Sequence, residues 1–224
     1  MPASLPRLHV VTDDSVLARG DFLAVAAGVL RAGGDGIALH LRGPHTPGAM
    51  VYRMAEALLP HFGATGALLV LNDRVDVALG LGAPKGVTLG VHLGRRSLPV
   101  DETRGLIGHD VLVGLSVHDD EEVAAGRLAG ADYLVFGHVH PTPSHMGERA
   151  AGTSGLASAV RAAGDVPVVA IGGMEASSVD EALDCGAFGV AALRGVWDSP
   201  APEGAVSDYI SALARYVDSS RPTQ

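Results

Sequence analysis

The chain has 224 residues, enough for one large hydrophobic core, and it is 47% hydrophobic and 18% charged. This composition excludes a disordered chain. Its net charge of −9 argues against a general binder of nucleic acid or of anionic membranes.

Short apolar segments alternate with longer segments of helical period along the whole chain. The predicted strands are Leu8–Thr12, Gly36–Leu41, Ala67–Leu71, Gly86–Leu93, Val111–Ser116, Tyr133–Phe136, Val168–Ile171 and Gly189–Leu193. The predicted helices are Asp21–Ala32, Pro47–Phe62, Arg74–Leu81, Asp101–Leu106, Asp119–Leu128, Ser154–Ala163, Ser177–Asp184 and 205–217. Most strands are continuous apolar runs, which is typical of a parallel sheet covered on both faces. Eight such units predict a closed (β/α)₈ barrel (a TIM barrel), with a doubly wound open sheet as the alternative.

No linker or low-complexity tract divides the chain, so we expect one domain over residues 1–217 and a flexible tail over 218–224. Cys185 is the only cysteine, which excludes an intramolecular disulfide and fits the cytoplasm. We find no signal peptide and no apolar run long enough to span a membrane. The predicted location is therefore the cytoplasm, with neither nucleic acid nor membrane as a partner.

Polar side chains follow the predicted strands, at the end of a barrel that normally carries its chemistry. They are His40, Arg42, Asn72, His92, Ser116, His118, His138 and His140. An imidazole at such a position suits acid–base chemistry near neutral pH. Several histidines together also suggest a metal, but acidic partners are sparse there, so we expect no metal site. Histidines at strand starts, such as His9, are expected to be structural or solvated.

Paired glycines, Gly172 and Gly173, follow the seventh predicted strand, and Leu193 and Arg194 end the eighth. Exposed backbone N–H groups bind a phosphate without lysine, and barrels often bind phosphate after these two strands. We therefore expect Gly173, Leu193 and Arg194 to bind phosphate. The alternative is that the glycines only form a tight turn.

Five segments carry a family resemblance. They are Asn72-Asp73-Arg74-Val75-Asp76-Val77-Ala78, Gly90-Val91-His92-Leu93-Gly94, Leu115-Ser116-Val117-His118, Gly130-Ala131-Asp132-Tyr133 with Phe136-Gly137, and Pro167–Gly173. In this order, over residues 8–196, they resemble the thiamine phosphate synthase superfamily. The resemblance implies a (β/α)₈ barrel, in agreement with the strand pattern.

One branch of that superfamily, thiamine phosphate synthase, joins a pyrimidine diphosphate to a thiazole phosphate. Its pattern has a lysine after the second strand and another in the loop after the sixth, where this chain has Pro44 and His145. It has an acidic metal ligand where this chain has Ser97. A leaving diphosphate needs Mg²⁺ and cations, and Asp73 alone is a poor Mg²⁺ site. These departures argue against the synthase branch.

The other branch, the TenI-type thiazole tautomerases, has Phe-Gly-His-Val where the synthases have Phe-Gly-Pro-Ile. This chain reads Phe136-Gly137-His138-Val139, and it shares the Leu-Gly-x-Arg-Ser-Leu run of that branch at 93–98. The resemblance implies an isomerase that needs no metal or other cofactor and converts a carboxy-thiazole phosphate to its aromatic tautomer. We therefore predict a thiazole tautomerase of thiamine biosynthesis, with His138 as catalytic acid–base and Arg42 as carboxylate partner.

Three alternatives stay open: a divergent thiamine phosphate synthase, a non-catalytic barrel that binds thiazole phosphates or regulates, and an enzyme for another phosphorylated small molecule. His140 is either a second pocket imidazole or a residue that packs the loop. The loops at 44–47 and 141–152 are long enough to close over the barrel mouth. Members of this family are often oligomeric, so the resemblance implies a homo-oligomer as one option.

Overall fold

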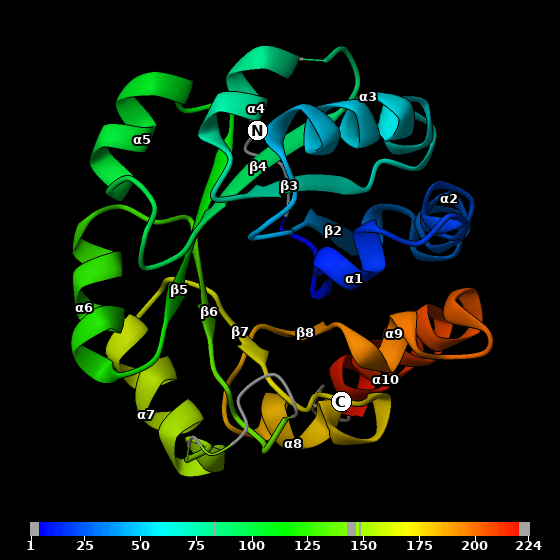
Figure 1. Cartoon of the computed structure of the whole chain (residues 1–224). Helices are drawn as coiled ribbons and strands as arrows, with labels where there is room; N and C mark the ends of the chain where they lie inside the picture. Colours follow the sequence, from blue (N-terminus) through cyan, green and yellow to red (C-terminus); the bar gives the residue numbers. More distant parts are fainter. Residues whose placement is uncertain (1–4, 83, 143–146, 148, 220–224) are drawn as a thin grey trace.

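The computed structural model describes residues 5–82, 84–142, 147 and 149–219. Within these residues, eight parallel strands pair in chain order and β8 pairs with β1, which closes the barrel. The strands are β1 (Leu8–Val11), β2 (Ile37–Leu41), β3 (Leu68–Asn72), β4 (Thr88–Leu93), β5 (Leu112–Val117), β6 (Tyr133–Phe136), β7 (Val168–Ile171) and β8 (Gly189–Ala192). The helices form a ring around the strands (Figure 1). The predicted (β/α)₈ barrel is confirmed.

The helices match the predicted ones apart from their ends and some short additions. They are α1 (Asp14–Leu17), α2 (Phe22–Gly33), α3 (Gly48–Thr65), α4 (Val75–Leu81), α5 (Val100–Ile107), α6 (Asp120–Leu128), α7 (Gly152–Ala163), α8 (Val179–Asp184), α9 (Arg194–Trp197) and α10 (Pro202–Ser219), with 3₁₀ turns η1 (Gly34–Gly36) and η3 (Ala176–Ser178). The sequence did not predict α1 and α9, because four residues are too few for a helical period. Asp13 nevertheless caps α1 by accepting the Val16 N–H.

Helix α10 extends to Ser219, past the predicted domain end at residue 217. Residues 220–224 lie outside the described residues, so a flexible tail stays a prediction. No helix in the described part of the chain has the length and apolarity to cross a membrane.

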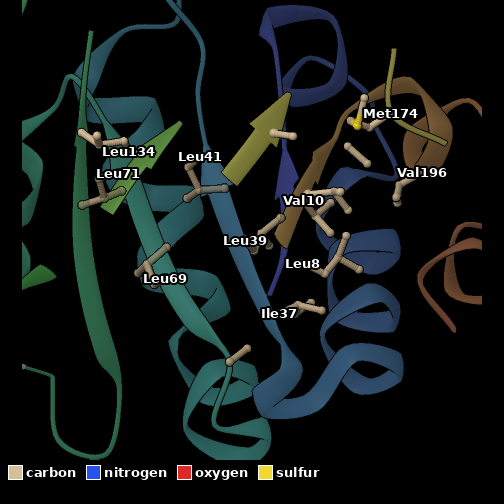
Figure 2. Packing of buried hydrophobic residues seen from close by; sticks show 14 of the residues in the cluster. Leu8, Val10, Ile37, Leu39, Leu41, Leu69, Leu71, Leu134, Met174 and Val196 are labelled. Atoms are coloured by element: carbon tan, nitrogen blue, oxygen red, sulfur yellow. The ribbon is translucent and has the colours of Figure 1, made fainter. Parts of the chain in front are cut away.

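Strand side chains alternate between two layers, as the pleat requires. One layer faces the helices and forms the main hydrophobic core, which includes Leu8, Leu39 and Leu69 (Figure 2). The other layer fills the barrel interior with smaller apolar clusters. These clusters contain Val11, Tyr133, Val135, Val169 and Ala191 on one side, and Ala38, Leu68 and Val70 on the other.

Three histidines share this interior layer. His9, His40 and His92 are 0%, 1% and 3% exposed, on β1, β2 and β4. Gly114 leaves room for the Tyr133 ring beside them, because a Cβ at Gly114 would lie 2.1 Å from that ring. Among its apolar clusters the barrel interior therefore contains a group of buried imidazoles below the site, and His9 belongs to this group.

Candidate active site

A cavity of about 700 Å³ opens at the carboxyl ends of the strands. Its lining includes the predicted pocket residues His40, Arg42, Asn72, His92, Ser116 and His118, together with His138, Gly173, Leu193 and Arg194. These residues come from six of the strand ends, β2 to β6 and β8, and from the turn after β7. The location of the site follows from the barrel, but the roles assigned to these residues remain predictions.

His40 connects the cavity to the barrel interior. Its Nδ1 lies 2.9 Å from the side-chain amide of Asn72, at Oδ1, and its Nε2 lies 2.8 Å from His9 Nδ1. The other nitrogen of His9, Nε2, lies 3.1 Å from the Pro6 carbonyl oxygen. Asn72 is 8% exposed and lines the cavity. A chain of buried, hydrogen-bonded side chains therefore runs from the barrel interior to the cavity floor.

Burial keeps these imidazoles neutral, because an apolar surrounding disfavours the charged form. Burial lowers the pKa of His40 to about 4, against the opposing effect of the hydrogen bond to Asn72. Burial also lowers the pKa values of His9 and His92 well below the ordinary value, and the nearby His40 lowers both further. His92 Nε2 lies 2.8 Å from the Ser116 hydroxyl. We conclude that this wall of the cavity offers neutral polar groups.

His138 follows β6 and is 7% exposed. The turn after β7 lies directly against it: a Cβ at Gly172 would be 2.4 Å from the His138 Cβ. Gly172 also has a φ of +99°, in the region that favours glycine. The Val139 N–H donates to the Ile171 carbonyl at 2.8 Å. A glycine after β7 is therefore what allows His138 to reach the cavity.

The predicted phosphate residues lie at the adjoining ends of β7 and β8. Gly173 has a φ of +65°, and Leu193 and Arg194 begin the short helix α9. The Arg194 side chain is 43% exposed, and its Nε lies 4.0 Å from Asp198. All three residues line the cavity. Phosphate binding at this end stays a prediction.

His140, by contrast, does not line the cavity within the described residues. Its Nε2 lies 3.4 Å from Glu181 on α8, and its N–H donates to the Gly172 carbonyl at 3.0 Å. This arrangement fits the loop-packing alternative. Much of the loop after it, at 143–146 and 148, lies outside the described residues, so closure over the site stays a prediction, and so does the place of His145.

Glu122 lies behind the site, in contact with two residues that line it, and the sequence reasoning missed it. Its carboxylate accepts from the His118 N–H at 2.8 Å and lies 2.9 Å from His118 Nδ1. Its other oxygen lies 2.9 Å from the Arg95 guanidinium. Partial burial would raise the Glu122 pKa, but the hydrogen bonds from His118 lower it overall. The spacing of four residues between His118 and Glu122 across a helix start was the available signal.

A second pocket of about 230 Å³ adjoins the cavity after β2 to β5. Arg42, Arg95 and Arg96 line it together with Asp73. These guanidinium groups give the pocket an excess of positive charge, which suits an anion.

The acidic part of this pocket is small. Asp73 Oδ1 accepts from the Gly94 N–H at 2.8 Å and from the Ser97 hydroxyl. No three His, Cys, Asp or Glu side chains in the described part of the chain are placed to hold one metal ion. Mg²⁺ prefers near-octahedral oxygen ligands, and one carboxylate that is already hydrogen-bonded supplies few of them. The residues present do not fit a protein-made Mg²⁺ site.

Comparisons with known proteins point to one family. Residues 8–196 match the family model described as thiamine monophosphate synthase. A thiamine-phosphate synthase of Acidothermus cellulolyticus is 37% identical over 96% of this chain and 99% of its own length. A putative thiamine-phosphate synthase of Geobacter sulfurreducens is 38% identical over 87% and 88%. The solved structure of a thiamine phosphate pyrophosphorylase from Pyrococcus furiosus superposes with a TM-score of 0.79 at 28% identity, covering 94% of this chain and 96% of that chain.

These findings correct the functional prediction. The expected thiazole tautomerase, an isomerase, is wrong, because the curated relatives at 32–38% identity over most of the chain are named as synthases. The departures at Pro44 and Ser97 gave a wrong prediction, because the sequence comparison considered lysines and carboxylates one position at a time. Arg95 and Arg96, which line the second pocket beside Arg42, supply positive charge that this count left out. Family model, relatives and fold agree, and the chain belongs to the thiamine monophosphate synthase family.

Proposed function

We propose that this protein is a thiamine-phosphate synthase, a transferase that joins a pyrimidine diphosphate to a thiazole phosphate. The observation that carries the proposal is the similarity, nearly end to end, to relatives named for this activity. The cavity agrees in size, because sites for small ligands typically enclose about 300–1,000 Å³. The single His-based isomerisation that the sequence suggested has no support among these relatives.

The diphosphate is assigned to the second pocket. When a diphosphate leaves, negative charge develops on its oxygens, and preorganised cations lower the barrier by stabilising that charge. Arg42 and Arg96 reach this pocket from the ends of β2 and β4, and the guanidinium fork matches phosphate oxygens. Arg95 contributes less charge, because Glu122 pairs with it at 2.9 Å. We assign no step to a metal, since the described residues do not form a site for one.

The thiazole phosphate is assigned to the opposite end, after β7 and β8. Gly173, Leu193 and Arg194 line the cavity, and we expect their backbone N–H groups and the Arg194 guanidinium to bind the phosphate. The two anionic ends then hold both substrates across one cavity, with their uncharged rings between them. Such positioning converts an encounter of two molecules into a reaction within one complex.

The acid–base role given to His138 falls with the tautomerase prediction. His138 remains in the wall between the two anionic ends, where its buried ring contributes shape to the cavity. The buried imidazoles of His40 and His92, with Asn72 and Ser116, form a neutral polar wall on the other side, and His118 lines the cavity next to them.

The test is a joining assay with omission controls. The purified protein is incubated with the pyrimidine diphosphate and the thiazole phosphate, in Mg²⁺ and in parallel in chelator, and thiamine phosphate is measured. We expect product only when both substrates are present. Turnover of the thiazole phosphate alone, or no product under any of these conditions, would overturn the proposal.

A further inference from the structure

The buried chain from Pro6 to Asn72 has a direction, and the direction has a chemical consequence. Its atoms are the Pro6 carbonyl oxygen, the two nitrogens of His9, the two nitrogens of His40 and the Asn72 amide, with spacings of 3.1, 2.8 and 2.9 Å. Each hydrogen bond needs one donor and one acceptor. A backbone carbonyl only accepts, so the Pro6 end fixes where the first proton lies.

Starting from Pro6, the protons follow in order. His9 Nε2 carries the proton that it donates to the Pro6 carbonyl, so neutral His9 keeps a lone pair on Nδ1. His40 Nε2 then donates to that lone pair, and neutral His40 keeps a lone pair on Nδ1. That lone pair faces Asn72 and requires a donor there. The two ends of a carboxamide have the same shape, and the hydrogen-bond network decides which is nitrogen.

The reverse order needs a charge. With the Asn72 oxygen toward His40, as it is placed at 2.9 Å, His40 Nδ1 and His9 Nδ1 would both carry protons, so the proposal exchanges the amide oxygen and nitrogen. The His9 Nε2 would then need a second proton to bond the Pro6 carbonyl 3.1 Å away. His9 would be an imidazolium, yet its side chain is 0% exposed. The rings around it are His40 at 5.0 Å and Tyr133 at 5.2 Å, and neither supplies a compensating negative charge. A buried charge without a partner is strongly disfavoured.

We propose that Pro6, His9, His40 and Asn72 form a one-way hydrogen-bond chain that turns the Asn72 side-chain oxygen toward the cavity, where it selects a substrate group that donates a hydrogen bond. His9 and His40 are positioning residues in this chain. His9 has no place in the cavity lining, and it acts through His40. The direction rests on the spacings in the chain and on the burial of His9. Placing the donor on the pyrimidine ring, as an amino or N–H group, rests on the proposed function.

The direction is tested without substrate, by ¹⁵N NMR of histidine-labelled protein at neutral pH. His9→Phe and His40→Gln variants assign the two sets of ring signals. We expect both rings to be neutral and protonated at Nε2, with Nδ1 unprotonated. A proton on His40 Nδ1, or an imidazolium at either position, would overturn the proposal.

The consequence is tested with a pair of ligands, a 4-aminopyrimidine and its 4-methoxy analogue, that carry the same diphosphate side chain. Calorimetry should show the amino ligand binding about tenfold more tightly, which is the usual net value of one hydrogen bond. His9→Phe should reduce this preference toward onefold, because His40 can then protonate at Nδ1 and Asn72 can reverse. His109→Phe, at an exposed position outside the cavity, should keep it.

Equal binding of the two ligands by the wild-type protein, or an unchanged preference in His9→Phe, would overturn the proposal. If neither ligand binds, the proposed function is wrong. The tautomers measured by NMR still decide the direction of the chain in that case.

Discussion

The two sides of the cavity are built to recognise ligands by different means. After β2 to β4, side chains line the cavity: imidazoles that burial keeps neutral, the Asn72 amide, and the guanidinium of Arg42. After β7, the backbone of Gly172 and Gly173 comes to the surface with positive φ angles. Removing a side chain should therefore impair the side after β2 to β4, whereas adding a side chain should disrupt the side after β7.

The largest expected effect is on the glycine side. In Gly172→Ala, the new Cβ would lie 2.4 Å from the Cβ of His138 and 2.6 Å from its Cα, at a φ of +99°. Overpacking and the left-handed conformation together should lower the free energy of unfolding by about 4 kcal/mol. Denaturant titration measures the change. Gly105→Ala is the matched control, because nothing lies within 4 Å of its Cβ. Equal effects of the two substitutions would contradict the account.

Next in size is the loss of a cation from the side-chain half. Arg42→Gln removes a charge that we place against the leaving diphosphate, so kcat/KM for thiamine phosphate formation should fall about 100-fold. Arg53→Gln, an exposed position on α3 outside both pockets, should leave kcat/KM unchanged. Steady-state kinetics with each substrate varied in turn makes the measurement. A fall of less than threefold in Arg42→Gln would remove that arginine from the diphosphate site.

The buried imidazoles predict a pH dependence of stability. His40 has a folded-state pKa of about 4, whereas the unfolded chain binds the proton below about 6.5. Between these values the unfolded state holds more protons, so stability falls as pH falls, by about 1.4 kcal/mol per pH unit for this histidine. His40→Gln should reduce the slope of unfolding free energy against pH by that amount between pH 6 and 4.5. An unchanged slope would mean that His40 is protonated in the folded protein.

The smallest effect concerns Glu122, whose side chain is 33% exposed. Its pKa is lowered in the folded state, so its contribution is present above the unfolded pKa and is lost as pH falls. Because solvent screens the group, Glu122→Gln should cost about 0.5 kcal/mol at pH 7 and nothing at pH 3. Thermal unfolding of both proteins at the two pH values measures this. A penalty of the same size at pH 3 would assign the effect to packing.

The sequence predicted the fold because each buried strand is a continuous apolar run with a helical period after it. It placed ten residues at the cavity, since a parallel barrel brings all strand ends to one mouth. It missed contacts between side chains of different elements. His9 looked like a strand-start residue, yet the pairing of β1 with β2 places its ring 5.0 Å from that of His40. Glu122 fell inside the predicted helix Asp119–Leu128, and its contact with His118 was not predicted.

The functional error has a similar cause. Reading single positions after the strands gave weight to Pro44 and Ser97 as lost ligands. The second pocket assembles Arg42 with Arg95 and Arg96 from a different strand end, and only the folded chain brings these charges together. The charge around a pocket comes from residues on several strand ends. One sequence motif therefore does not show whether that charge is kept or lost.

The central claim, that this cavity joins two phosphorylated substrates, is tested most directly by ³¹P NMR of one reaction mixture. The pyrimidine diphosphate signals should disappear while inorganic diphosphate and thiamine phosphate appear in equal amounts. Release of diphosphate without thiamine phosphate, or unchanged spectra with both substrates and Mg²⁺ present, would contradict the claim.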